Sequence, residues 1–407
     1  MGFSGLFAIG VSGVQAQATG LEAISNNIAN SQTTGYRRAA ASFAQLVTGT
    51  DRAGEITTGP GRQGEGQGVA ARLETDHHLQ GLIRRTDTDT HLAISGRGFF
   101  AVEDPGLGGT DDNVGNTLFT RAGDFQVSNA GVLVNSAGQT LLGVPLSGAN
   151  AGNGAGVIAS LGALEPIDLS QATGRGAATE ALSVSLAGNS SGERTVQLFD
   201  ATGAVRTLTV SLVPQDDTSA TLTLTDGQTP LATGTIIFDR DGAPNLDAST
   251  LPESFTIDGQ SVALALTQDQ ANGAFSSGFA VSQRGGTAFG TVTGFQIDES
   301  GVLRATLSNG LSDPLYQIPL ALFTNAEGLI RADDTAFRFD PQAGTLTLTT
   351  ANTDGAGLLE ASALENSTVD ITQSFSLLIE TQRAYAANAQ ILSVTDELLE
   401  TLNGTAA

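Results

Sequence analysis

The sequence contains neither cysteine nor lysine in its 407 residues. Without cysteine the chain has no disulfide framework, no cysteine-ligated zinc and no thiol nucleophile. Tryptophan is also absent, methionine occurs once, and aromatic residues make up only 5% of the chain. A hydrophobic core must therefore be built from leucine, valine, isoleucine and alanine, with scattered phenylalanine.

Basic residues are missing from the N-terminal stretch, where a secretory signal peptide would carry them. The first cation of the chain is Arg37, so no charged region precedes the apolar run GFSGLFAIGVSGVQA. That run is also too short and too polar to span a membrane. If the protein acts outside the cell, we expect an export route that does not cleave such a signal.

Positive charge is scarce along the whole chain, because 42 Asp and Glu oppose 18 Arg and give a net charge of −24. This balance argues against non-specific binding to nucleic acid. Residues 1–100 hold 8 Arg and 8 acids, so the excess lies in residues 101–407, which hold 10 Arg and 34 acids. The neutral first quarter can pack against copies of itself, whereas the acidic remainder is typical of a solvated outer body.

Glycine is abundant, at 51 residues, and serine and threonine are frequent as well. This composition is typical of all-β proteins with many tight turns. A charged fraction of 15% and a mean hydropathy of +0.03 exclude a generic disordered chain. The length predicts two or three domains.

Both ends of the chain predict helices. Residues 4–30 carry small and apolar residues every three or four positions, at Leu6, Ile9, Gly13, Ala16, Gly20, Ala23 and Ile24. From Thr368 to Leu402 a heptad pattern predicts a second helix, with its seam at Ile371, Phe375, Leu378, Gln382, Tyr385, Ala389, Leu392, Asp396 and Leu399. One stripe on each helix predicts that the two helices pair as a coiled-coil stem.

The chain between the helices predicts β structure. Alternating strands and glycine turns recur throughout, and GFQIDESGVLRATLSNG predicts a hairpin. Glycine-rich stretches at 49–68 and 147–163 predict a loop and a domain boundary. The predicted fold class is mainly β with terminal α-helices. Its predicted domains are the helical stem with its linker (1–75 and 360–407), a β-rich middle domain (76–146 and 286–359) and a β-rich outer inserted domain (147–285).

Two loop motifs resemble ligand-binding sites only weakly. GPGRQGEGQG lacks the Lys-Ser/Thr pair of a phosphate-binding loop, so a linker is the favoured interpretation. DRDGAPNLD gathers Asp239, Asp241, Asn245 and Asp247 but lacks the spacing and the closing Glu of an EF-hand. An acidic β-turn is favoured there over a calcium site.

The histidines and carboxylates show no catalytic pattern. His77 and His78 are adjacent, so on a strand they point to opposite faces, and together with His91 they favour surface or packing roles over metal binding. No nucleophile elbow or zinc-protease motif occurs. We expect no catalytic residue, no metal ligand and no cofactor, although a convergent site in a β-rich enzyme stays an alternative.

Four segments resemble the signatures of bacterial flagellar rod and hook proteins. SNNIANSQTTGYRR, residues 25–38, together with the preceding LFAIGVSGVQAQATGLEAI, resembles their N-terminal signature. LAISGRGFFAVE, LFTRAGDFQVSNAGVLVNSAGQTLLG and ALENSTVDITQSFSLLIETQRAYAANAQILSVTDELLETL resemble the internal and C-terminal ones. Thr368 departs from the Asn usual in hook members, and we expect it to cap the C-terminal helix.

The resemblance favours the hook members of the family over the shorter rod members. GTAFGTVTGFQIDESGVLRATLSNG, IPLALFTNAEGLIRADDTAFRF and the insert at 150–285 resemble hook sequences. This implies a structural subunit that polymerises into a curved flexible tube and transmits torque from motor to filament. A distal rod or hook–filament junction protein is the nearest alternative. A secreted adhesin would share the acidic β body but would not need two terminal helices.

In this family the paired terminal helices line a narrow channel, so the resemblance implies subunit contacts along them. Asn27 and Asn30 would end the first helix, Gly35 would permit the reversal, and Tyr36 would face a neighbour or, alternatively, pack on its own domain. The candidate interface residues are Leu6, Ile9, Ile24, Asn27, Asn30, Gly35, Tyr36, Arg37, Phe375, Leu378, Gln382, Arg383, Tyr385, Leu392 and Leu399. The candidate hinge residues are Gly59, Gly61, Gly64, Gly66 and Gly68.

The resemblance also implies partners and a location. The partners would be further copies of the chain, rod proteins below, junction proteins above, and the hook cap and the flagellar type III export apparatus during assembly. No nucleic acid and no small-molecule substrate would be bound. The protein would lie in the extracellular flagellum, exported without a cleaved signal peptide.

Overall fold

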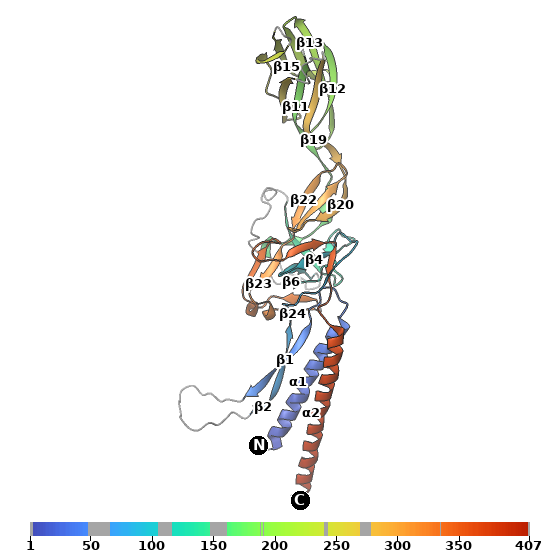
Figure 1. Cartoon of the computed structure of the whole chain (residues 1–407), viewed down its shortest axis with the longest axis vertical. Helices are drawn as coiled ribbons and strands as arrows, with labels where there is room; N and C mark the ends of the chain where they lie inside the picture. Colours follow the sequence, from blue (N-terminus) through green and yellow to red (C-terminus); the bar gives the residue numbers. More distant parts are fainter. Residues whose placement is uncertain are drawn as a thin grey trace, which may run out of the picture. The chain divides into compact units, whose positions relative to one another are not determined.

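The structure is a computed structural model of the chain (Figure 1). It describes residues 3–47, 66–104, 116–146, 161–187, 189, 191–239, 243–268, 278–333 and 335–405. The chain divides into two compact units. Unit 1 comprises Met1–Ser170, Gln296–Leu303 and Pro314–Ala407, and unit 2 comprises Gln171–Phe295 and Arg304–Asp313.

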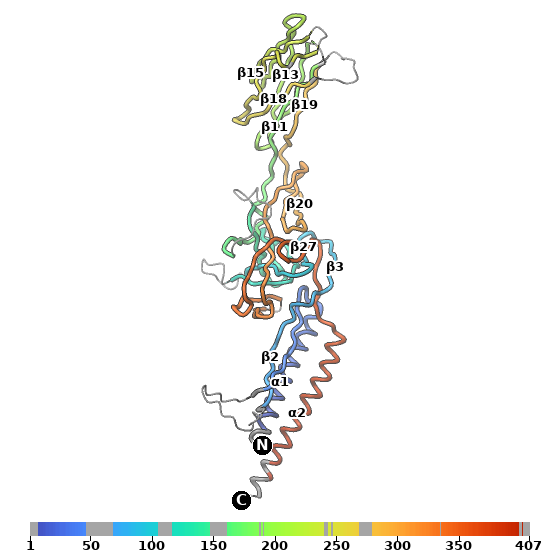
Figure 2. The backbone as a smooth tube through the Cα atoms, turned by 60° about the vertical axis from the view of Figure 1, so that its left-hand side comes forward, coloured from blue at the N-terminus to red at the C-terminus, as the bar shows by residue number. Residues whose placement is uncertain are grey.

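Two long helices and a hairpin, which we call the stem, form one part of unit 1. The helices are α1 (Phe3–Ala29) and α2 (Ile371–Thr405), and the hairpin joins β1 (Ala39–Val47) to β2 (Gly66–Thr75). The helices are antiparallel, because Gly10 lies beside Leu392 whereas Gly20 lies beside Thr381. Both views show them side by side (Figures 1 and 2). The predicted helix at each end of the chain is therefore confirmed.

The hairpin packs against α1. β1 and β2 pair antiparallel, from Ala39 opposite Thr75 to Val47 opposite Gly66. The ring of Phe43 reaches the backbone of α1 at Gly20. The predicted loop at 49–68 therefore ends earlier than expected, since β2 already begins at Gly66. Among the described residues no helix is both long and apolar enough to cross a membrane.

The rest of unit 1 is a β-rich body in which strands from distant parts of the chain pair with one another. β5 pairs with β23, β6 with β25, β4 with β27 and β3 with β28. The strands that precede unit 2 in the chain are β3 (Ile83–Arg85), β4 (Leu92–Ser95), β5 (Phe99–Glu103), β6 (Thr117–Thr120), β7 (Gln126–Val127), β8 (Leu133–Val134), β9 (Thr140–Pro145) and β10 (Glu165–Pro166). Those that follow it are β23 (Leu320–Phe323), β24 (Ile330–Arg331), β25 (Ala336–Arg338), β26 (Leu346–Thr349), β27 (Leu358–Ala361) and β28 (Ala363–Glu365).

Phenylalanine rings fill the core of this body. Phe119 and Phe323 meet edge to face, with ring centroids 4.9 Å apart, and Phe99 and Phe337 lie in the same buried cluster. Edge-to-face pairs add stabilisation beyond area burial. Short 3-10 turns at η3 (Leu161–Ala163), η4 (Leu169–Gln171), η5 (Ala326–Gly328) and η6 (Pro341–Ala343) connect the strands. Four phenylalanines thus pack together where strands from the two halves of the chain interleave.

Unit 2 consists of two sheets around one core, which is mostly aliphatic and includes Phe238, Phe255 and Phe279. One sheet has the strand order β17-β18-β11-β19 and the other β12-β13-β14-β15-β16. Leu208, Val210 and Leu212 alternate inward from β13, as the period of a half-buried strand requires. The strands are β11 (Arg175–Ala187), β12 (Gly192–Phe199), β13 (Val205–Asp216), β14 (Ser219–Asp226), β15 (Thr229–Phe238), β16 (Pro244–Thr250), β17 (Ser254–Ile257), β18 (Gln260–Gln268) and β19 (Gly278–Gly290).

The chain passes between the units within β20 (Val292–Ile297), β21 (Val302–Leu307) and β22 (Ser312–Gln317). β20 and β21 are neighbours, and Asp298 Oδ1 closes their turn by accepting the Val302 N–H at 2.9 Å. The predicted hairpin is thus present, and the predicted fold class, mainly β with a helix at each end, is confirmed. The three-domain division stays a prediction, and most of its boundary at 147–163 lies outside the described residues.

Candidate functional site

Glycines on α1 let the two helices of the stem approach closely. Gly10, Gly13 and Gly20 are buried, and α2 lies directly on them. A Cβ at Gly13 would lie 3.1 Å from the side chain of Asn388, and one at Gly20 would lie 3.4 Å from the Thr381 methyl group. Ala16, Ala23 and Ile24 continue the buried face. The predicted stripe of α1 from Gly13 onwards is therefore the face that packs.

The face of α2 that packs on α1 differs from the predicted seam. Ser374 and Thr395 are buried, and Thr381 and Asn388 complete a seven-residue spacing between them. The Thr381 hydroxyl donates to the Leu377 carbonyl at 2.7 Å. Because the hydroxyl is satisfied within its own helix, the methyl group is free to pack on glycine. The α2 face that meets α1 therefore combines polar Thr381 and Asn388 with Leu392, which packs on Gly10 and is the one residue of the predicted seam shown in contact with a described glycine of α1.

Most of the predicted apolar seam of α2 is exposed in the single chain. Phe375 is 49% exposed and Tyr385 is 37% exposed. Gln382 and Arg383 are exposed as well. The other large exposed apolar residues of the stem helices are Phe7, Ile9, Val11, Ile371, Leu377, Ile379, Ile391, Val394 and Leu398. The stem therefore carries apolar side chains that its own chain leaves uncovered.

Leu6 and Leu399 lie within α1 and α2, but their side chains are outside the described ones. Gly59, Gly61 and Gly64 also lie outside the described residues. Gly66 and Gly68 are in β2, and Gly68 has a φ of 126° beside Ser12 of α1. These two glycines belong to the hairpin.

Asn27 ties the end of α1 to the start of the hairpin. Its side chain donates to the Ala39 carbonyl at 2.6 Å and accepts the Ala39 N–H at 2.9 Å. The Tyr36 hydroxyl donates to the same Asn27 oxygen at 3.2 Å. Asn30 instead bonds locally, donating to the Asn26 carbonyl and accepting from the Thr33 hydroxyl. Asn27 thus fixes the path by which the chain leaves the helix.

Gly35 makes the reversal that follows. Its φ of 69° lies in the left-handed region, and a Cβ would overlap the backbone of Arg121 and Ala122. Its N–H donates to the Glu365 carbonyl at 2.8 Å. Only glycine satisfies both the dihedral angle and the close approach.

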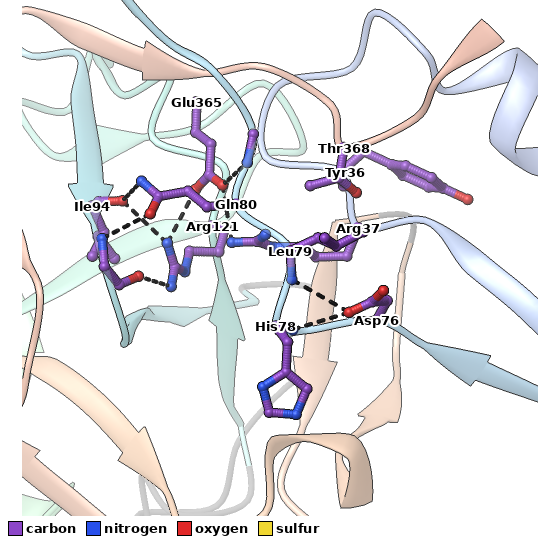
Figure 3. Close-up of polar contacts among 12 residues, drawn as sticks. Tyr36, Arg37, Asp76, His78, Leu79, Gln80, Ile94, Arg121, Glu365 and Thr368 are labelled. Carbon is purple, nitrogen blue, oxygen red and sulfur yellow. Dashed lines mark hydrogen bonds and ion pairs between the residues drawn. The ribbon is translucent and has the colours of Figure 1, made fainter. Parts of the chain in front are cut away.

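Arg37, Arg121 and Glu365 form a buried charge cluster, which we call the anchor (Figure 3). Arg37 Nη2 lies 2.9 Å from Glu365 Oε1, and Arg121 Nη1 lies 3.1 Å from Glu365 Oε2. The three side chains are 1%, 4% and 1% exposed in that order. The Gly81 N–H also donates to Glu365. One carboxylate thus holds together segments from the start, the middle and the end of unit 1.

Burial dominates the electrostatics of the anchor. It lowers the pKa of Arg121 to about 10, a shift that the charge of Arg37 increases and Glu365 opposes. Burial likewise lowers the pKa of Arg37, and Glu365 again opposes the shift. Both guanidinium groups stay charged at neutral pH. Because charges out of water are costly unless paired, the carboxylate of Glu365 is what makes the cluster tolerable.

Tyr36 and Arg37 lie inside the chain, each 1% exposed. The Arg331 guanidinium sits 5.0 Å from the centre of the Tyr36 ring and donates to the Arg37 carbonyl at 2.9 Å. In this structure both side chains contact their own unit, as the alternative interpretation of Tyr36 had it.

Thr368 does not cap α2 as predicted. The helix begins at Ile371, and Asp370 caps it by accepting the Gln373 N–H at 3.1 Å. Thr368 Oγ1 instead accepts the N–H of Arg38 at 2.9 Å. The prediction was wrong because the helix starts later than the sequence suggested. Thr368 still joins the two ends of the chain.

The histidines take separate positions. The His77 ring wedges edge-on between Phe99 and Phe337, at 5.5 and 4.6 Å between ring centroids. Burial, and then the charge of Arg37, lowers its pKa to about 3. His78 is exposed beside Glu327, and His91 bonds to the Thr86 hydroxyl.

No cluster of metal-ligating side chains occurs among the described residues. The acidic turn of DRDGAPNLD falls partly outside them. Within it, Asn245 donates to Asp239 at 3.1 Å. This hydrogen bond gives the turn an internal partner for the carboxylate.

Sequence reasoning missed Glu365, Arg121 and the polar residues of the helix seam. The local sequence did offer a signal for Glu365, because this acid ends the apolar strand Ala363–Glu365. A carboxylate in such a buried strand needs a cationic or hydrogen-bonding partner. Nothing in the local sequence names Arg121 as that partner.

Three family models match the chain. They are described as "Flagella basal body rod protein" (residues 7–37), "Flagellar hook protein FlgE/F/G D1 domain" (residues 93–189) and "Flagellar basal body rod FlgEFG protein C-terminal" (residues 360–405). The first and third cover almost all of α1 and α2.

Full-length relatives are also similar. The flagellar hook protein FlgE of Brucella suis biovar 1 is 29% identical over 414 residues, which cover 99% of each chain. Proteins of the same name from Salmonella typhimurium and Escherichia coli K12 are each 28% identical and cover 97% of this chain and 98% of theirs. The similarity therefore includes the inserted unit 2 as well as the ends.

Proposed function

We propose how this chain works from the premise that it belongs to the bacterial flagellar rod and hook protein family, as a structural subunit of the flagellar hook. Such a subunit polymerises into a curved flexible tube that transmits torque from motor to filament. One observation carries the mechanism: the stem helices pair through a narrow glycine seam and leave large apolar side chains uncovered. Neighbouring copies are the partners that would cover them.

The uncovered apolar face of α2 is our candidate for the contact between subunits. Phe375 and Ile379 are about half exposed, so covering them completely would contribute about half of the 1.5–3 kcal/mol that burying a fully exposed side chain gives. The first hundred residues, which include α1 and the hairpin, are balanced in charge, whereas α2 carries four acids and one arginine. We therefore assign the interface role to the exposed candidates, and an internal role to Tyr36 and Arg37.

Electron microscopy of the purified protein after concentration tests this function, beside a version that lacks residues 1–30 and 370–407. We expect hollow tubes from the full chain and folded monomers from the shortened one. If neither version assembles, or if the shortened one assembles equally well, the stem is not the polymer core.

The stem helices should become more ordered on assembly, because a long surface helix gains most of its stability from packing. Hydrogen exchange of α1 and α2 should therefore slow markedly between monomer and tube. Equal protection in both states would contradict this part of the proposal.

We further propose that rod proteins, junction proteins, a hook cap and the type III export apparatus are the other partners. Export would be unfolded and without signal cleavage, which intact-mass measurement of the secreted protein tests. A mature chain trimmed well beyond Met1 would contradict it. The role is mechanical, and we propose no catalytic activity.

Of the five candidate hinge glycines, Gly59, Gly61 and Gly64 remain our proposal for a hinge that permits bending. Gly64→Pro is the cleaner test, since Gly66 and Gly68 lie in β2. Unchanged curvature of the tubes would contradict the hinge.

A further inference from the structure

A cavity of about 400 Å³ lies in unit 1 beside the anchor. Arg37, Arg97 and Arg121 line it together with His77 and His78, and its lining includes no aspartate or glutamate among the described residues. The whole chain has 42 acids and only 18 arginines. The lining of this cavity is therefore basic, whereas the chain as a whole is acidic.

Several nitrogen atoms at this place lack hydrogen-bond partners. Arg37 Nε and Nη1, Arg121 Nε and both ring nitrogens of His77 are buried and unpartnered within the described part of the chain. A buried donor left without an acceptor is destabilising. The five atoms belong to three residues that line one cavity, and the three guanidinium nitrogens among them are donors without an acceptor among the described residues.

The charges of the cavity are unbalanced as well. The single carboxylate of Glu365 serves both Arg37 and Arg121. Arg97 is exposed at the cavity and forms no ion pair with any described residue. At the rim, Glu327 faces His78 at 3.4 Å, and Asp76 is engaged by Arg38 at 3.1 Å. Arg37 and Arg121 therefore carry one positive charge more than the carboxylate that they share.

We propose that this cavity binds an anionic oxygen group, a carboxylate or an inorganic oxyanion. Guanidinium donors suit such groups. Arg37 Nε and Nη1 have no acceptor among the described residues, whereas Arg121 Nη1 and Nη2 already donate to Ile94, Glu365 and Gly96. Such an oxygen group could come from either of two sources. One is a free anion in solution. The other is an aspartate or glutamate side chain of a second copy of this chain, and this second version rests on the proposed function.

Isothermal titration calorimetry of the unassembled full chain with inorganic phosphate, and separately with acetate, tests the site. We expect saturable binding at one site per chain. Arg97→Gln should weaken it at least about tenfold, by analogy with the loss of one charge-assisted contact. Arg194→Gln removes an exposed arginine of unit 2 and should leave the affinity unchanged.

Arg97 suits the test because its exposed side chain can be changed without disturbing the anchor. Absence of saturable binding by either anion, or equal weakening by both substitutions, would overturn the proposal. The unassembled chain is used, so this outcome is independent of whether the protein forms tubes.

Assembled tubes then separate the two sources. If a neighbour's carboxylate fills the cavity, tubes take up no phosphate and phosphate slows assembly of the wild-type chain more than sodium chloride of equal ionic strength. If the anion is free, tubes bind one phosphate per subunit. Loss of phosphate binding in tubes without any effect on assembly would contradict both versions.

Discussion

Glu365 is the residue on which the junction between stem and body depends most directly. Its carboxylate contacts two buried arginines and the Gly81 N–H, and it is 1% exposed. A buried charge whose partner is removed is strongly destabilising, whereas an exposed pair contributes little. This chain contains both a buried ion-pair cluster and an exposed ion pair, so the two can be compared.

Glu365→Gln should lower the free energy of unfolding of unit 1 by about 3–5 kcal/mol, because two guanidinium groups lose their counter-charge. Hydrogen exchange of core amides in urea measures this. Asp258→Asn is the control, since it breaks the exposed pair of Arg206 and Asp258 in unit 2 and should cost at most about 1 kcal/mol. Similar losses in the two variants would show that the anchor is not a stabilising cluster.

His77 should make unit 1 less stable in acid. Its pKa in the folded protein is about 3, below the unfolded value of about 6.5. The unfolded chain therefore binds the extra proton between these values, and stability is lost as pH falls through that window. Between pH 7 and pH 5 the loss from this residue is at most about 2 kcal/mol.

His77→Phe removes the titrating ring but keeps an aromatic wedge between Phe99 and Phe337. The difference in unfolding free energy between pH 7 and pH 5 should therefore shrink relative to the wild type. His78→Gln, at an exposed position, should leave the pH dependence as it is. A pH profile unaltered by His77→Phe would show that His77 is not the group responsible.

At the scale of single elements, the glycine seam sets how closely α1 and α2 approach. Gly13→Leu would drive a side chain into Asn388, whose atoms lie 3.1 Å from the position of a Cβ. Such overpacking costs about 1–3 kcal/mol. Amide protection in α2 should therefore fall by about tenfold or more in hydrogen exchange. Gln15→Leu, on the exposed face of α1, should leave it unchanged.

The elements were easier to predict than the contacts between them. The stripe from Gly13 to Ile24 predicted both α1 and the face on which it packs. The prediction succeeded because small residues at helical spacing mark the face where another helix can approach closely. The seam of α2 was placed on Phe375 and Tyr385, since a heptad is usually read from its apolar residues. The side chains that meet the glycines of α1 are instead Thr381, Asn388 and Leu392, because glycines let the backbones approach until α2 side chains of mixed polarity touch them.

The anchor lies beyond local sequence patterns for a different reason. Arg121 and Glu365 are 244 positions apart, and no periodicity links residues at that distance. Thr368 was assigned to the wrong role for a related reason, since its partner at Arg38 is 330 positions away. Strand pairing across the inserted unit brings these groups together.

For the whole molecule, the exposed apolar face of α2 should determine assembly without affecting the fold. Phe375→Glu places a charge on a side chain that is 49% exposed in the single chain, so the monomer should keep its stability. Tube formation should be lost, because the charge would be buried between copies. Light scattering and electron microscopy measure assembly, and hydrogen exchange measures folding.

Gln390→Glu is the matched control, since it adds one charge at an exposed polar position of the same helix. It should permit tubes. If Gln390→Glu blocks assembly as strongly as Phe375→Glu does, net charge rather than the apolar face governs association.

The hydrogen bond between Arg38 and Thr368 and the ion pair between Arg37 and Glu365 also impose an order of events on folding. A chain that emerges from its N-terminus presents two arginines early, and their counter-charge arrives only after some three hundred further residues have followed. Unit 2 has its own core and can form meanwhile. Closing so long a loop is slow. The ion pair that joins stem and body therefore cannot form before the chain has emerged at least as far as Glu365, and the pairing of α2 with α1 needs the residues that follow it.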